Sequence, residues 1–89
     1  MKILVVCGNG LGSSFMMELN VKKVLDKLGV KAEVSHTDLA SSKTEDADYF
    51  IGSPEIMEQL VDGKRKTISV VNIFNLDEIQ SALESALEV

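Results

Sequence analysis

Continuous hydrophobic runs alternate along the chain with segments that carry hydrophobic residues at helical spacing. Residues 3–6 form an apolar run rich in β-branched residues, which is typical of a strand buried on both faces. Between Ser13 and Leu28 the apolar positions recur on one helical face, and Gly29 then provides a helix stop. This stripe consists of Met17, Val21, Val24, Leu25 and Leu28. The chain therefore begins with a predicted strand, a glycine-rich connection and a helix.

The middle of the chain predicts two further strands joined by a polar crossover. Residues 31–36 alternate between apolar and polar positions, so we expect a half-exposed strand at an edge of the sheet. Residues 37–47 are polar and weakly periodic. The segment is long enough to connect two parallel strands and has room for one irregular turn of helix. The short apolar segment 48–51 then predicts a buried strand.

The last part of the chain predicts a helix, a strand and a second helix. Ser53 and Pro54 have the residue types of an N-cap and a first helical position, and this helix is expected to stop at residues 62–63. Residues 66–71 form the fourth predicted strand. The sequence Asn-Leu-Asp-Glu at 75–78 has the form of a capping box at the start of the terminal helix. The apolar stripe of that helix consists of Leu76, Ile79, Leu83, Ala86 and Leu87.

This order of elements predicts an α/β fold in which helices cover both faces of a parallel sheet. The half-polar second strand belongs at an edge and the apolar first and third strands in the middle. Right-handed crossovers then give the strand order 2-1-3-4, a four-stranded, flavodoxin-like and Rossmann-like three-layer αβα sandwich. The 89 residues are expected to form a single domain, residues 1–89. Ligands of such sheets bind beyond the carboxyl ends of the strands, where the segment after residue 6 lies.

Composition excludes several classes of protein. A single cysteine rules out an internal disulfide and points to a reducing compartment. The apolar run near the N-terminus is too short for a signal peptide or a membrane span, so we expect a cytoplasmic protein. A net charge of −5, with 14 acidic against 9 basic residues, and an aromatic content of 4 % argue against nucleic acid as a partner.

The connection between the first strand and the first helix carries the candidate chemistry. It consists of Cys7, Gly8, Asn9, Gly10, Leu11, Gly12, Ser13 and Ser14. A glycine-rich turn into a helix N-terminus gathers backbone N–H groups in one concavity where the helix dipole favours an anion, and the two serines add hydroxyl donors. The same donors are expected to lower the pKa of the Cys7 thiol. We therefore predict that Cys7 is a nucleophile that holds a phosphoryl group and that residues 8–14 bind the phosphate, without a metal or a cofactor.

The glycine-rich loop has three other interpretations. Cys7 could be a small buried hydrophobe in a tight turn, with the loop acting as a non-catalytic anion- or partner-binding module. A nucleotide-binding Walker loop would need a lysine where Gly12 stands. Cysteine-dependent phosphatases of similar fold place an arginine six residues after the nucleophile, where this chain has Ser13, and the only arginine, Arg65, opens the fourth predicted strand. Passing a phosphoryl group onward needs positioning and N–H donors more than a guanidinium, so the loop suits a relay better than a phosphatase-like hydrolase.

In length, element order and this loop, the whole chain resembles the cytoplasmic IIB component of the bacterial phosphoenolpyruvate-dependent sugar phosphotransferase system (PTS). The loop is similar to that of ascorbate-type IIB proteins, which read Cys-Gly-Asn-Gly-x-Gly-Ser-Ser, whereas mannitol-, galactitol- and lactose- or chitobiose-type loops differ at positions 8–10. The resemblance implies a phosphotransferase in which Cys7 accepts phosphate from a phosphohistidine on a IIA protein. It also implies transfer to a carbohydrate, expected to be L-ascorbate, bound by the membrane permease IIC. We expect a monomer, since one face must serve two partners in turn.

Four residues near the loop have two interpretations each. His36 could act on the Cys7 site or donate to phosphate, or it could be an ordinary edge-strand histidine. Asp38 would face the same end of the sheet, where a carboxylate repels phosphate, so a structural role is favoured. Phe15 and Met16 lie off the apolar stripe and could form a docking surface around Cys7 or pack under a neighbouring loop.

Overall fold

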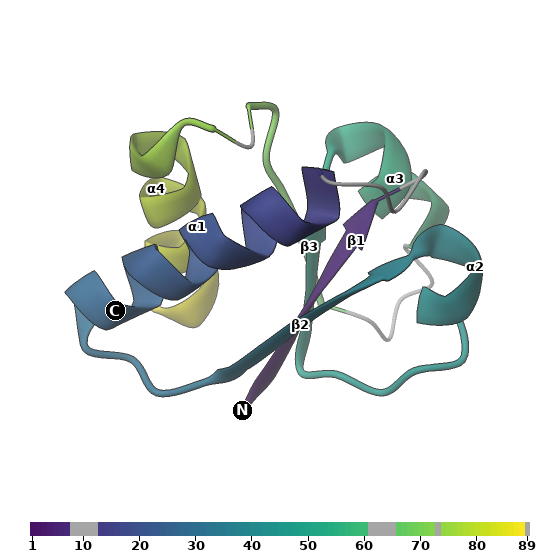
Figure 1. Cartoon of the computed structure of the whole chain (residues 1–89), viewed down its shortest axis with the longest axis horizontal. Helices are drawn as coiled ribbons and strands as arrows, with labels where there is room; N and C mark the ends of the chain where they lie inside the picture. The colour runs from purple at the N-terminus through teal and green to yellow at the C-terminus, as the bar shows by residue number, and fades with distance from the viewer. Residues whose placement is uncertain (8–12, 61–65, 73, 89) are drawn as a thin grey trace.

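The computed structural model describes residues 1–7, 13–60, 66–72 and 74–88. In this part of the chain, one sheet is formed by β1 (Lys2–Cys7), β2 (Glu33–Asp38), β3 (Tyr49–Gly52) and β4 (Thr67–Ser69). The helices are α1 (Ser13–Leu28), α2 (Leu39–Ser42), α3 (Pro54–Leu60) and α4 (Leu76–Leu87), as Figure 1 shows. The strands pair in parallel in the order β2-β1-β3-β4, which confirms the predicted α/β topology.

Helices cover both faces of the sheet and bury the central strand β1. Ile3 and Val5 point to the face covered by α1 and α4, whereas Leu4 and Val6 point to the face covered by α3. All four side chains have no exposed area, which explains why the apolar run in β1 is continuous rather than alternating. The layer under α1 and α4 includes Met17, Val21, Ile79 and Leu83, and the layer on the other face includes Phe50, Met57 and Leu60.

The helix α1 has the predicted bounds, and its C-terminal end is specified locally. Gly29 follows it with φ +73°, a conformation that glycine adopts without strain. The N–H of Gly29 donates to the carbonyl of Asp26 at 3.2 Å and that of Val30 to the carbonyl of Leu25 at 3.0 Å. These two bonds form a Schellman motif, which satisfies the last carbonyls of the helix.

Strand ends match the prediction less closely. β2 runs from Glu33 to Asp38 rather than over 31–36, and β4 is confined to Thr67–Ser69 within the predicted 66–71. The predicted turn of helix in the crossover is present as α2, and the predicted stop at 62–63 lies outside the described residues. Hydrophobic alternation does not define a strand end, because the end depends on where the neighbouring strand stops pairing.

The start of α4 corrects the predicted capping box. Asn75 is the N-cap, and its Oδ1 accepts a hydrogen bond from the Glu78 N–H at 3.1 Å. The Glu78 carboxylate, however, accepts hydrogen bonds from Val71 N–H at 2.6 Å and Asn72 N–H at 3.0 Å instead of returning to Asn75. The N–H of Asn75 donates to the carbonyl of Asn72 instead. Glu78 therefore holds the turn that follows β4, and Leu76, predicted in the buried stripe, is 43 % exposed at the first position of the helix.

Gly52 allows the close approach of β1 and β3 at the end of the sheet that carries Cys7. It is the last residue of β3 and lies in register with Val6. A Cβ at this position would overlap the carbonyl oxygen of Val6 and would lie 3.0 Å from Cε of Met57. The methionine end can move, but the backbone oxygen cannot move without displacing β1.

We expect Gly52→Ala to lower the free energy of unfolding by about 1–3 kcal/mol, the usual effect of forcing extra atoms into a packed site. Urea denaturation followed by circular dichroism measures this change. Gly29→Asn is the matched control, because a Cβ there meets nothing within 4 Å and asparagine tolerates a positive φ. Equal losses in the two variants would contradict the role of the Val6 contact.

Candidate functional site at the carboxyl edge of the sheet

The carboxyl ends of three adjacent strands meet at one edge of the sheet. Cys7 is the last residue of β1 and lies in register with Asp38, the last residue of β2. On the other side, Val6 pairs with Gly52, the last residue of β3. The helix α1 begins at Ser13, six residues beyond the end of β1, so its N-terminus lies at this same edge (Figure 1). The fold therefore places the cysteine where α/β sheets bind their ligands.

The structure describes the backbone at both ends of the predicted phosphate-binding segment, residues 7–14. Cys7 terminates β1, and Ser13 and Ser14 open α1. The remaining predicted phosphate-binding residues, Gly8, Asn9, Gly10, Leu11 and Gly12, lie outside the described residues, as does Arg65. The first turn of a helix has N–H groups without partners inside the helix, and they favour a negative charge nearby. The end of β1 and the N-terminus of α1 thus lie at the same edge of the sheet, on two elements that both contribute residues to the core.

Asp38 has the structural role that the sequence favoured. It is the N-cap of α2, and its Oδ1 accepts a hydrogen bond from the Ser41 N–H at 2.7 Å. This bond lowers the pKa of the Asp38 carboxyl below its ordinary value, because it stabilises the ionised form. The carboxylate next to the end of β1 is therefore directed to the start of α2, where a negative charge is favourable.

His36 is held against α1. It pairs with Val5, two residues before the end of β1. Its Nδ1 lies 3.1 Å from Oε1 of Glu18, and its ring meets the Phe15 ring edge-on, with the centroids 6.1 Å apart. Sequence reasoning did not identify Glu18, although a signal existed: it lies three residues before Val21 and so borders the buried stripe of α1. It is only 8 % exposed.

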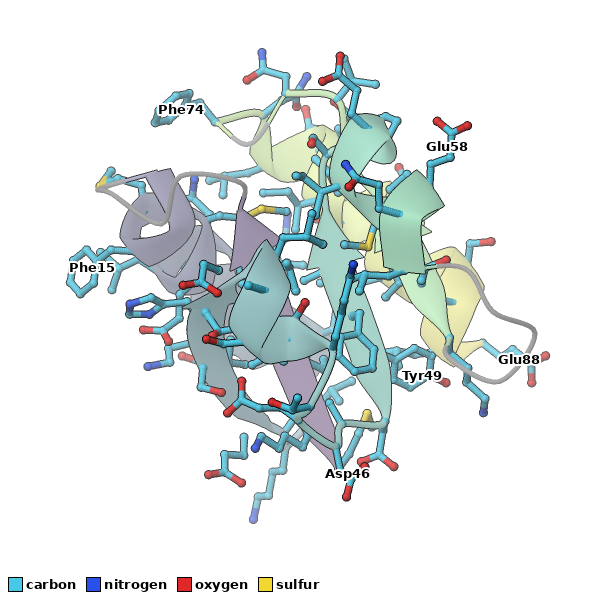
Figure 2. The ribbon with its side chains drawn as sticks, turned by 90° about the vertical axis from the view of Figure 1, so that its right-hand side faces the viewer. Phe15, Asp46, Tyr49, Glu58, Phe74 and Glu88 are labelled. Atoms are coloured by element: carbon cyan, nitrogen blue, oxygen red, sulfur yellow. The ribbon has the colours of Figure 1, made fainter. Side chains whose placement is uncertain are left out.

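Several large apolar side chains are exposed at this edge. Phe15 is 50 % exposed and Met16 42 %, which confirms that they lie off the buried stripe. Val71 (76 %) and Phe74 (64 %), which the sequence analysis did not identify, lie between β4 and α4. Asn72 Oδ1 accepts a hydrogen bond from the Phe74 N–H at 3.0 Å, so the turn itself is fixed. Figure 2 shows Phe15 and Phe74 projecting on the same side of the molecule.

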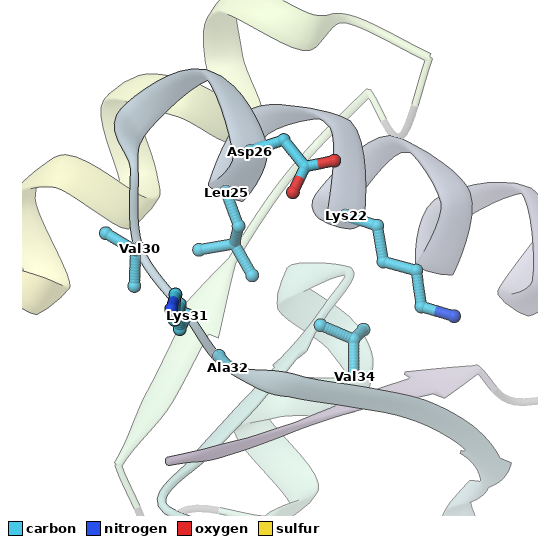
Figure 3. Close-up of a pocket in the computed structure, with 7 residues that line it drawn as sticks. All are labelled: Lys22, Leu25, Asp26, Val30, Lys31, Ala32 and Val34. Carbon is cyan, nitrogen blue, oxygen red and sulfur yellow. The ribbon is translucent and has the colours of Figure 1, made fainter.

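A hollow of about 360 Å³ lies elsewhere, between the second half of α1 and the chain that leads into β2 (Figure 3). It is lined by Lys22, Leu25, Asp26, Val30, Lys31, Ala32 and Val34. Lys31 and Ala32 precede β2, so the hollow opens toward the amino edge of the sheet. It is therefore separate from the edge that carries Cys7.

These observations define the class of protein: an αβα sandwich that presents a cysteine and a helix N-terminus at the carboxyl edge of its sheet. Residues 2–85 match the family described as "PTS system, Lactose/Cellobiose specific IIB subunit". An ascorbate-specific PTS system EIIB component from Mycoplasma pneumoniae is 31 % identical over 88 residues, which cover 96 % of this chain and 93 % of the relative. The chain belongs to the PTS IIB family, and this membership assigns it a role in sugar phosphotransfer.

A second relative supports the family, and a solved structure supports the fold. The ascorbate-specific EIIB component from Escherichia coli O157:H7 is 32 % identical over 77 residues, which cover 83 % of this chain and 76 % of the relative. The lactose-specific IIB domain structure from Streptococcus pneumoniae has the same fold, with a TM-score of 0.62 at 19 % identity, over 99 % of this chain and 95 % of that one.

The described residues contain neither a membrane-spanning helix nor a cluster of metal ligands. None of the helices in ranges 1–7, 13–60, 66–72 and 74–88 is long and apolar enough to span a membrane. Within those same ranges, no three His, Cys, Asp or Glu side chains gather as metal ligands.

The Asp38 cap predicts a pH-dependent contribution to stability. Because the pKa of Asp38 is lowered in the folded protein, this contribution is present near neutral pH and is lost as the pH falls below about 4. Asp38→Asn keeps an N-cap acceptor but does not titrate. We expect the wild type to be more stable than Asp38→Asn at pH 7, with the difference shrinking at pH 3, as measured by urea denaturation at both pH values. A stability difference between the two proteins that is the same at pH 7 and pH 3 would contradict a lowered pKa of Asp38.

Proposed function

We propose that this chain is the phosphoryl carrier of a sugar phosphotransferase system and that Cys7 carries the phosphoryl group. The observation that supports this most is the position of the sole cysteine, at the end of the central strand and directly before the segment that leads into α1. The N-terminal end of that helix favours a thiolate and then the charge of a phosphoryl group. Membership of the PTS IIB family supports the same assignment.

The proposed reaction has two transfers. In the first, the Cys7 thiolate attacks the phosphorus of a phosphohistidine on a IIA protein; an S–P bond forms, the N–P bond breaks, and the imidazole nitrogen keeps the electron pair. In the second, a sugar hydroxyl held by the IIC permease attacks; an O–P bond forms, the S–P bond breaks, and sulfur leaves as a thiolate. The hydroxyl proton passes to a base on the permease or to water. The N–H groups at the start of α1 contribute by stabilising charge on the transferring oxygens.

We further propose that the chain acts at the cytoplasmic side of the membrane and that L-ascorbate is the transported substrate. The support for ascorbate is the 31 % and 32 % identity to EIIB components named ascorbate-specific. Within these matches, the loop sequence at residues 7–14 supports it further, since it is similar to that of ascorbate-type IIB proteins. The description of the matching family names lactose and cellobiose, which are therefore the competing substrates.

We expect Cys7→Ser to abolish phosphorylation of this protein, with a loss of roughly a thousandfold or more, because a serine hydroxyl lacks the ionised nucleophile. The assay supplies phosphoenolpyruvate and the upstream PTS proteins, including a IIA protein, and detects the phosphorylated chain by intact-mass spectrometry. Glu45→Gln, an exposed change in the crossover after α2, serves as the control and should be phosphorylated like the wild type. Phosphorylation of Cys7→Ser at the wild-type rate would contradict the proposal.

The same preparation separates the competing functions. Hydrolysis of an aryl phosphate by the isolated chain would favour a phosphatase, which the serine at position 13 argues against. Membranes that contain the IIC permease, supplied with L-ascorbate, lactose or cellobiose in turn, identify the acceptor that removes phosphate from Cys7. Removal by lactose or cellobiose alone would contradict the ascorbate assignment.

The exposed apolar side chains predict a docking surface for the phosphohistidine protein. Phe74→Ser should raise the KM for that protein about tenfold and leave kcat near the wild-type value, because it removes contact area without touching Cys7. Lys31→Ser is the control, since it also shortens an exposed side chain, but near the amino edge of the sheet. Steady-state transfer rates at varied donor concentration give both constants, and an unchanged KM in Phe74→Ser would remove Phe74 from the docking surface.

A further inference from the structure

The side chain of Glu18 is a buried acid on the helix that follows the Cys7 loop. The residue is 8 % exposed, and its side chain 10 %. A carboxylate in such surroundings destabilises the fold unless it has partners. Two are present: Lys22 Nζ, one helical turn further along at 3.5 Å, and His36 Nδ1 from the neighbouring strand at 3.1 Å.

The His36 side chain is held by two residues of α1 at once. Its Nδ1 reaches Glu18, and its ring edge meets Phe15 at an interplanar angle of 90°, a favourable arrangement of aromatic rings. Phe15 and Glu18 are three residues apart and therefore lie on one side of the helix. A carboxylate only accepts hydrogen bonds, so in this pair Nδ1 carries the proton. We call Phe15, Glu18 and His36 the α1–β2 clamp.

The position of the clamp gives it a specific consequence. Met17 is the first described residue of α1 that is anchored in the core, and Phe15 and Met16 before it are exposed. The clamp adds a second anchor, to the edge strand β2, which pairs only with β1 in the described sheet. His36 lies two positions before Asp38, the register partner of Cys7. The two anchors together fix the orientation of the helix N-terminus relative to the end of β1.

We propose that His36 and Glu18 are positioning residues for phosphoryl transfer: through the α1–β2 clamp they hold the first turn of α1 so that its N–H groups face the group carried by Cys7. This inference rests on the proposed function for the reaction it serves. Stabilisation by N–H donors depends steeply on their placement, and small displacements of groups remote from the reacting atoms reduce rates strongly. Neither residue needs to touch the phosphoryl group.

Four variants test the clamp. His36→Phe keeps an aromatic ring against Phe15 and removes the bond to Glu18, and Glu18→Ala removes the bond from the other side. His36→Asn keeps a donor near the position of Nδ1, and Glu18→Gln keeps an acceptor for it. Ile79→Val, in the core under α4, is the control for general loss of stability. Should Glu18→Ala fail to fold, His36→Phe carries the comparison, since the His36 side chain is 39 % exposed.

We expect His36→Phe and Glu18→Ala to lower kcat for transfer from the phosphohistidine protein about tenfold, with KM within about twofold of the wild type. His36→Asn and Glu18→Gln should recover most of the rate, and Ile79→Val should transfer at the wild-type rate. A loss in His36→Phe no larger than that in Ile79→Val would overturn the inference. So would a His36→Asn variant as slow as His36→Phe, because the Glu18 bond would then not be the cause.

A second measurement needs no phosphoryl donor and separates this inference from the proposed function. The rate of Cys7 alkylation by iodoacetamide, recorded against pH, reports the ionisation of the thiol near the helix N-terminus. We expect the midpoint of this profile to move to higher pH in His36→Phe and Glu18→Ala and to stay in place in Ile79→Val. If the wild type accepts no phosphate but the midpoint still shifts in His36→Phe and Glu18→Ala, the proposed function is refuted and the role of the α1–β2 clamp is supported. Normal phosphorylation with unshifted midpoints in all variants would refute the clamp and keep the function.

Discussion

The strand β1 pairs with a parallel neighbour on each side, and the position of every residue at the carboxyl edge follows from this pairing. It places Cys7 opposite Asp38 and Val6 opposite Gly52, and no one-residue slip is tolerated, because a slip would turn each buried side chain of β1 to the other face. Both faces are already filled by helices. The backbone position of Cys7 is therefore set by the same packing that holds β1 in the core.

Much of the fold could be predicted because β1 and α1 are specified by local sequence. A continuous apolar run has a single interpretation in a small α/β protein, and the stripe of α1 together with Gly29 fixes both the face and the end of that helix. The half-polar character of β2 was enough to place it at an edge and so to derive the strand order. The element ends in β2 and β4 were missed, since they depend on the partner strand and not on the residues of the strand itself.

The contacts of Glu78 and Glu18 show what sequence patterns could not supply. The pattern at 75–78 predicts that Glu78 bonds back to the N-cap, but two N–H groups of the turn after β4 compete for the same carboxylate and take both of its oxygens. In the sequence, Glu18 is one more polar residue of an amphipathic helix. Its contact with His36 depends on the position of β2 beside α1. The partners of Glu78 lie in an adjacent turn, and His36, the partner of Glu18, lies on another element. Side-chain pairing across elements becomes visible only once the topology has set which elements meet.

The absence of an arginine six residues after Cys7 agrees with a carrier on energetic grounds. A guanidinium fork would bind the phosphoryl group strongly in the phosphocysteine state as well as in the transition state, and binding both states equally does not speed the step. A hydrolase can use such a guanidinium group, because water is always present to complete its reaction. In the proposed reaction the carrier must give its phosphoryl group to a sugar bound by the permease, so a more stable phosphocysteine would raise the barrier to that transfer. In the proposed reaction, Ser13 at the start of α1 brings no positive charge, and the helix N–H groups would stabilise the phosphoryl charge through their orientation. For this chemistry, the precise placement of α1 matters more than the number of positive charges around the cysteine.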